Sequence, residues 1–329
     1  MSEKTMSSKT IGAELSYTSV PEAAAIKFVD TIEIDQEGHR LYAGDNWSGG
    51  VDVFDVSSPE ARFIKTVRIR GTFYGVCVAK DLNKVFVGLS GSRVAVIDVD
   101  PSSATADTVV ATISTGGTGN ADLIDYDPAH KKIYIANRNE GFLASIDAVK
   151  NVLLKKIEGL GGGLEQPRFN PADGMVYLAG NTDDVLYQID PETDSLVNTF
   201  VLDEDCHPNG LAINPASGQA LLACANRQRP HTLFFDLKEQ KIASVIEETG
   251  SGDGATYDPT IDRFFFAASG WKDGPVIGIF GGNPARFIAN VPTGRMASWV
   301  AYDRTNRLVY APTIRDGMPA LLSFPLPDV

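Results

Sequence analysis

The chain has 329 residues, of which 43% are hydrophobic and 22% are charged, a balance typical of a globular protein with a sizeable core. Its 29 Lys and Arg residues and 42 Asp and Glu residues give a net charge of −13. Such a surface repels phosphate backbones and anionic lipids, so we expect neither nucleic acid nor a membrane as a partner.

The N-terminal segment is polar and has no apolar run of signal-peptide length. No stretch of the sequence approaches the ~18 consecutive apolar residues that a membrane-spanning helix needs. We therefore expect a cytoplasmic protein in which residues 1–10 form a flexible N-terminus and residues 11–329 form a single domain.

Short apolar runs that end in Asp or Asn recur along the chain. They are VDTIEID (29–35), FYGVCVA (73–79), ADLIDYD (121–127), EQPRFN (165–170), NGLAIN (209–214), DGATYD (253–258) and SWVAYD (298–303). Each run is followed by a turn and a second β-rich segment, and most are followed by a third and a fourth. Four short strands in a repeat of ~40 to 50 residues are typical of a β-propeller blade.

The last repeat ends after LLSFPL, near residues 320–325, and lacks a fourth strand. The segment IGAELSYTS (11–19) precedes the first run and has no blade of its own. We predict that this segment supplies the missing strand, because closure of the ring removes an exposed sheet edge. The expected fold is all-β: a seven-bladed β-propeller of four-stranded blades, with the last blade closed by the N-terminal strand.

Three consecutive repeats, at residues 85–114, 133–159 and 176–202, follow the order strand, Asn-containing or Gly-containing turn, strand, Asp, turn, strand. In this order the sequence resembles the YVTN repeat family of bacterial and archaeal propellers. The resemblance covers most of the chain and implies the propeller fold. It implies no single function, because propellers of this kind serve as enzymes, binding modules and scaffolds.

One aligned position, two residues before the first apolar residue of each channel strand, carries polar or aromatic side chains in every repeat. These residues are Asp30, Tyr74, Asp122, Glu165, Asn209, Asp253 and Ser298. We expect their side chains to point toward one axis at the mouth of the channel. Carboxylates crowded there have raised pKa values or require a cation.

The candidate metal ligands are Asp30, Glu165, Asn209 and Asp253, because Ca²⁺ and Mg²⁺ take oxygen ligands. Zinc requires several His or Cys ligands, and only His207 lies near this ring. The ligand set is similar to that of gluconolactonase and paraoxonase-type propellers, which hold a divalent metal at the channel entrance. Those propellers have six blades, so we expect a wider ring here, in which water fills the gap.

Other polar residues of the same face are candidates for chemistry. His207 is a candidate general base and Asp122 can move a proton, whereas Tyr74 either donates a proton or fills the channel throat. The candidate substrate-binding residues are Trp47, Arg138, Arg227, Trp271 and Arg295. Arginines on an acidic protein suit an anionic small-molecule substrate.

Two further patterns have structural interpretations. The Asp and Asn residues that end the channel strands are expected on the opposite face, where they cap turns. The cysteines Cys77, Cys206 and Cys224 are odd in number and form no C-x-x-C pair, so we expect neither a disulfide framework nor a structural zinc.

Three functions remain open from the sequence. The first is a metal-assisted small-molecule enzyme, with a lactonase-like hydrolase as its leading form and a lyase or isomerase acting through an oxyanion or enolate as others. The second is a noncatalytic propeller that binds a small ligand or a protein partner at the same mouth. The third is a purely structural or sensor role, in which the acidic ring holds a cation that relieves the repulsion between its carboxylates. No G-x-S-x-G, H-E-x-x-H or P-loop motif occurs.

Overall fold

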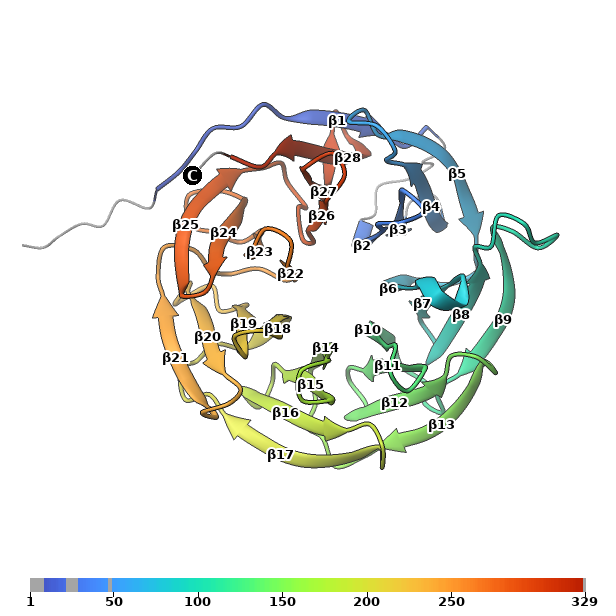
Figure 1. The fold of residues 1–329 in the computed structure, drawn as a ribbon, viewed down its shortest axis with the longest axis horizontal. Helices are drawn as coiled ribbons and strands as arrows, with labels where there is room; N and C mark the ends of the chain where they lie inside the picture. The colour runs from blue at the N-terminus through green and yellow to red at the C-terminus, as the bar shows by residue number, and fades with distance from the viewer. Residues whose placement is uncertain (1–8, 22–28, 47–48, 328–329) are drawn as a thin grey trace, which may run out of the picture.

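The structure, a computed structural model, describes residues 9–21, 29–46 and 49–327. Its strands form seven four-stranded antiparallel sheets, arranged as blades around a central channel (Figure 1). The predicted seven-bladed β-propeller is therefore confirmed. No helix in the described ranges is long and apolar enough to cross a membrane.

The first three blades follow the repeats in chain order. Blade one consists of β2 (Val29–Asp35), β3 (Arg40–Asp45), β4 (Gly50–Asp55) and β5 (Arg62–Arg68). Blade two consists of β6 (Phe73–Ala79), β7 (Lys84–Leu89), β8 (Arg93–Asp98) and β9 (Thr108–Ser114), with a short 3-10 helix, η1 (Lys80–Leu82), between its first two strands. Blade three consists of β10 (Ala121–Asp127), β11 (Lys132–Asn137), β12 (Phe142–Asp147) and β13 (Val152–Ile157).

The next three blades repeat this order. Blade four consists of β14 (Leu164–Asn170), β15 (Met175–Gly180), β16 (Val185–Asp190) and β17 (Ser195–Val201). Blade five consists of β18 (Pro208–Asn214), β19 (Gln219–Cys224), β20 (Thr232–Asp236) and β21 (Lys241–Ile246). Blade six consists of β22 (Ala255–Asp258), β23 (Arg263–Ala268), β24 (Val276–Gly282) and β25 (Ala285–Pro292).

Blade seven joins the two ends of the chain. It consists of β26 (Ala301–Asp303), β27 (Leu308–Arg315), β28 (Met318–Pro325) and the N-terminal strand β1 (Ser16–Ser19). β1 pairs antiparallel with β28, from Ser16 opposite Ser323 to Ser19 opposite Ala320. The predicted closure of the ring by the segment 11–19 is confirmed, and in Figure 1 β1 forms the outer edge of this blade.

The core lies between neighbouring blades, whose sheets pack face to face. One cluster joins Phe86 and Val96 of blade two to Ile135 and Ala144 of blade three. The third strands are almost wholly buried, which explains their runs of Val, Ile and Ala, whereas outermost strands such as β9 are largely exposed. Burial on both faces therefore replaces the alternating pattern that a sheet with one exposed face has.

Turns on one side of the ring are capped by the residues that end the innermost strands. Asp35 Oδ1 accepts hydrogen bonds from the backbone N–H groups of Glu37 and Gly38, at 3.1 and 2.9 Å. Equivalent bonds are made by Asp127, Asn170, Asn214, Asp258 and Asp303. The predicted turn-capping role of these residues is confirmed.

The sequence expectation for the cysteines was wrong. Cys206 and Cys224 form a disulfide, and Cys77 is a buried free thiol. Cys206 lies just before β18 and Cys224 ends β19, so the antiparallel hairpin of blade five brings together two residues that are 18 positions apart. This pairing depends on strand register, which cysteine spacing does not reveal.

Removal of residues 1–19 tests the closure of the ring. We expect the melting temperature to fall by more than about 5 °C and the protein to self-associate, because the edge of β28 is left unpaired. A peptide of residues 9–20, added in trans, is expected to restore part of the lost stability in a concentration-dependent way. An unchanged melting temperature in differential scanning fluorimetry contradicts a stabilising role for β1.

Candidate functional site

Five innermost strands carry a β-bulge at the same end. Their pairing with the second strand shifts register at the positions occupied by the predicted ring residues Asp30, Tyr74, Asp122, Glu165 and Asn209. A bulge leaves a residue out of the hydrogen-bonded ladder and changes the direction of its side chain. In blades six and seven, Asp253 and Ser298 lie just before the innermost strands.

Six of the seven ring residues line one cavity of about 410 Å³ at this end of the channel. They are Asp30, Tyr74, Asp122, Glu165, Asn209 and Asp253, and the remaining lining residues are Asn120, Leu123, Arg138, Asn139 and Trp299. We call this space the mouth cavity. The structure thus brings ring residues from six blades together, and the lining contains four carboxyl groups and the guanidinium of Arg138.

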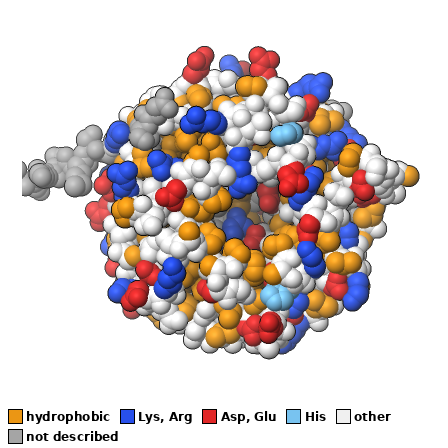
Figure 2. All heavy atoms as spheres, viewed as in Figure 1, with side chains coloured by type: hydrophobic (Ala, Val, Ile, Leu, Met, Phe, Trp, Pro, Cys, Tyr) orange, Lys and Arg blue, Asp and Glu red, His pale blue; other side chains and the backbone are white. Residues whose placement is uncertain are grey.

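A second chamber of about 270 Å³ continues the channel toward the opposite face and is lined by Glu33, Asp125 and Arg168, among others. Leu123 and Trp299 line both chambers and so lie between them. Figure 2 shows a hollow at the centre of the face in view, with acidic and basic side chains inside it. The channel therefore offers two polar chambers that an apolar constriction divides.

Burial raises the pKa of every carboxyl group in the mouth cavity. The pKa of Asp122 rises to about 6, because burial and the charge of Asp253 outweigh the opposing charge of Arg138. Burial, followed by repulsion from Asp122 and Asp253, raises the pKa of Asp30 well above its usual range. The pKa values of Glu165 and Asp253 are also raised, first by burial. These groups therefore hold protons or attract a cation.

Arg138, from the loop between β11 and β12, provides part of the compensating charge. Its Nη2 lies 2.6 Å from Glu165 Oε1, and its Nη1 lies 3.8 Å from Asp122 Oδ2. The closer contact is an ion pair by distance but is not aligned as a hydrogen bond, and Glu165 Oε1 is buried without a hydrogen-bond donor. This oxygen therefore has the charge of Arg138 beside it but no aligned hydrogen-bond donor.

Asn209 lies in a hydrogen-bonded chain. Its Oδ1 accepts from Asn181 Nδ2 at 2.6 Å, and its Nδ2 donates to Asp253 Oδ1 at 2.7 Å. The predicted catalytic residue His207 lies behind this chain and is not part of the cavity lining. Its Nδ1 lies 3.0 Å from Asn181 O, and its Nε2 lies 3.1 Å from Asp205 Oδ1. In this arrangement His207 positions Asn181 and, through it, Asn209.

Tyr74 lies in the cavity beside the carboxyl groups. Burial raises the pKa of its phenol, and the charges of Asp122 and Asp30 raise it further. The phenol therefore stays protonated at neutral pH and can donate a hydrogen bond or a proton.

The predicted substrate-binding residues are placed differently. Trp47 lies outside the described residues. Trp271 is 5% exposed, packs in an apolar cluster of blades five and six, and does not line the cavity. Arg227 does not line the cavity, but its charge lowers the pKa of Asp253. The backbone oxygen of Arg295 accepts hydrogen bonds from Thr313 and Ile314. Of the four that the structure describes, Arg138 lines the cavity.

The spacing of the mouth carboxylates bears on metal binding. Within the described ranges, no three of them bring ligand oxygens within 4.8 Å of one another. A cation at this place needs water molecules to complete its coordination, as Mg²⁺ commonly does. Glu165 Oε1, which has an ion pair with Arg138 but no aligned hydrogen-bond donor, is a candidate oxygen for such a cation.

Comparisons with known proteins support the fold alone. The chain is similar to solved structures titled Kuenenia stuttgartiensis hydrazine synthase (TM-score 0.74, 15% identity, 92% of this chain and 97% of the other), U3-55K (0.75, 8%, 95% and 98%) and mitotic checkpoint complex (0.75, 12%, 95% and 94%). No protein-family model and no curated protein matches the chain.

The raised pKa of Asp122 predicts a pH-dependent gain of stability in Asp122→Asn. The folded protein binds this proton more tightly than the unfolded chain, so wild-type stability falls as pH rises from about 4 to about 6 and stays lower above that range. Relative to wild type, the variant gains up to about 3 kcal/mol across this interval. Urea unfolding between pH 4 and pH 8 measures the difference.

Asp316→Asn is the matched control, because the side chain of Asp316 is 93% exposed. We expect its unfolding free energy to follow wild type at every pH. A difference between Asp122→Asn and wild type that is the same at pH 4 and pH 8 contradicts the raised pKa.

Proposed function

We propose that the mouth cavity binds a divalent cation together with a small substrate, and that the protein is a metal-assisted enzyme of the lactonase-like hydrolase type. The observation that carries this proposal is the group of four carboxyl groups around one cavity, of which those of Asp122 and Glu165 are buried, with Arg138 as the cationic residue of the lining. We propose with it that the chain resembles YVTN-repeat propellers in its repeats and gluconolactonase-type propellers in its mouth. A cytoplasmic location is part of the same proposal.

The cation would be held by Glu165, Asp253, Asp30 and Asn209, with Ca²⁺ or Mg²⁺ as its identity. The lack of an aligned hydrogen-bond donor to Glu165 Oε1 supports this assignment, and the width of the ring favours an ion that keeps several waters. A cation bound here supplies a Lewis acid for a carbonyl oxygen.

The residues of the chain supply the proton transfers. Asp122, with a pKa of about 6, is mostly ionised at neutral pH and can accept a proton from an attacking water. The Tyr74 phenol can donate a proton to the departing alkoxide of an opened lactone. Arg138 can bind the carboxylate of an anionic substrate or product, and Leu123 and Trp299 give the cavity an apolar floor.

A noncatalytic role is the second candidate. The side-chain amide of Asn209 already makes one hydrogen bond through its oxygen and one through its nitrogen. The positive charge of Arg138, together with protons bound to the carboxyl groups, can compensate the negative charge of the mouth without a metal. On this alternative the mouth binds a cationic small ligand or a basic protein loop. The solved structures of similar fold include one titled as an enzyme and one titled as a complex, which leaves both classes open.

Calorimetric titration with Ca²⁺ and Mg²⁺, followed by a panel of lactones and esters, tests the proposal. We expect one cation per chain, a raised melting temperature that a chelator reverses, and cation binding weakened by at least about tenfold in Glu165→Gln. Loss of the proton acceptor in Asp122→Asn is expected to lower turnover by about 100-fold or more. The exposed-site variant Asp316→Asn is expected to leave both measurements unchanged.

The two candidates give different results. A folded protein that binds a cation or another ligand but turns over no member of the panel favours the noncatalytic role. A protein that contains no divalent ion by elemental analysis and binds none in titration contradicts the metal-assisted mechanism.

A further inference from the structure

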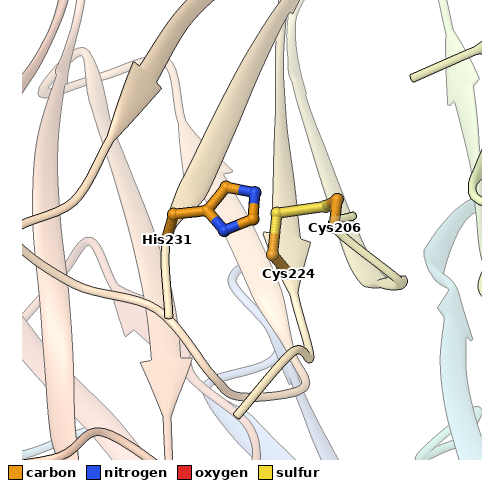
Figure 3. A group of neighbouring side chains, drawn as sticks. All are labelled: Cys206, Cys224 and His231. Atoms are coloured by element: carbon orange, nitrogen blue, oxygen red, sulfur yellow. A yellow bond between two sulfur atoms is a disulfide. The ribbon is translucent and has the colours of Figure 1, made fainter. Parts of the chain in front are cut away.

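Blade five contains a second cluster of potential ligands, separate from the mouth carboxylates. Cys206, Cys224 and His231 are all fully buried, and their Sγ and ring nitrogen atoms lie within 4.8 Å of one another. Cys206 precedes β18, Cys224 ends β19 and His231 precedes β20, so successive strands of one sheet carry the three side chains. In Figure 3 the imidazole of His231 points toward the disulfide.

The histidine of this cluster is in the form that binds metals. Its Nδ1 lies 2.7 Å from the backbone oxygen of Arg229, so Nδ1 carries the hydrogen and Nε2 has a free lone pair. Nε2 is buried and has no hydrogen-bond partner. Metal-binding histidines commonly donate their other ring N–H to a backbone carbonyl in this way. An unpartnered buried acceptor is costly, so this nitrogen has a reason to receive a ligand.

We propose that reduction of the Cys206–Cys224 disulfide converts the cluster into a binding site for one Zn²⁺ ion, held by two thiolates and His231 Nε2. The ligand chemistry differs from that of the mouth, because thiolates and imidazole suit zinc, whereas carboxylates and amides suit Ca²⁺ and Mg²⁺. The inference does not depend on the function proposed for the mouth cavity.

The conversion needs a dithiol reductant, R(SH)₂. In the first step the dithiol gives two electrons and two protons to the Sγ–Sγ bond, which yields two Cys thiols and the oxidised ring RS₂. In the second step Zn²⁺ displaces the two thiol protons and binds both sulfurs and His231 Nε2. Two protons are released for each ion bound, so binding strengthens as pH rises.

Charge and geometry favour zinc in this place. Two thiolates neutralise the double charge of Zn²⁺, so the loaded cluster adds no net charge to an apolar core. Zinc–sulfur distances of ~2.3 Å place two tetrahedral ligands roughly 3.8 Å apart, which the cysteines reach by side-chain rotation from a Cα–Cα distance of 4.6 Å. Reducing compartments such as the cytosol keep such a pair in the thiol form.

Equilibrium binding of Zn²⁺ to the full chain, before and after treatment with dithiothreitol and its removal, tests the proposal. We expect the reduced protein to bind one Zn²⁺ per chain and the oxidised protein to bind none at the cluster. Co²⁺ in place of Zn²⁺ is expected to give thiolate-to-metal charge-transfer absorption. His231→Gln is expected to weaken Zn²⁺ binding at least about tenfold.

Matched variants separate this site from others. Cys77→Ala removes the third thiol, and Asp316→Asn removes an exposed charge outside both sites. Both variants are expected to bind zinc as the reduced wild type does. Cys206→Ala/Cys224→Ala is expected to lose the binding. If the reduced chain unfolds, zinc present during reduction is expected to preserve its near-UV circular dichroism. A reduced chain that binds no zinc when folded, or that unfolds equally with zinc present, overturns the proposal.

Discussion

The structure depends on the way in which seven innermost strands begin beside one axis. In five blades a bulge at that end leaves a residue out of the hydrogen-bonded ladder. Because the blades repeat, residues such as Asp30 and Asp253, which are distant in the sequence, line the same cavity. The free-energy cost of placing several carboxyl groups together then dominates the chemistry of the site, whether protons or a bound cation compensate their charge.

Side chains that bond from one innermost strand to the next hold this arrangement. Thr31 Oγ1 donates to Tyr74 O, Gln166 Oε1 accepts from Leu211 N–H, and Asp125 Oδ2 accepts from Phe169 N–H. Each bond joins the innermost strands of neighbouring blades, which belong to separate sheets. The ring is therefore stabilised from inside by polar contacts and between the blades by apolar packing, so that the cavity is held by a rigid frame.

The repeat made the architecture and the ring predictable, because one aligned position per blade has one place in space. Residues outside that alignment were harder to predict. His207 lies in the right loop but bonds to Asn181 and Asp205, and Trp271 is used in the core. The cavity is also lined by three residues that the sequence analysis did not identify, Asn120, Asn139 and Trp299. Each lies close in the sequence to a candidate residue, and this closeness was the signal that could have identified them.

Blade five connects the two candidate sites through one short loop. Cys206 is fixed to Cys224, and the next residue, His207, bonds to Asn181 through both its ring and its backbone oxygen. Asn181 in turn donates to Asn209, which donates to Asp253 in the mouth cavity. A change in the bonding of Cys206 therefore acts on the loop that orients the Asn209 amide. Since this amide opposes the raised pKa of Asp253, one continuous chain of hydrogen bonds runs from the disulfide loop to a carboxyl group of the mouth.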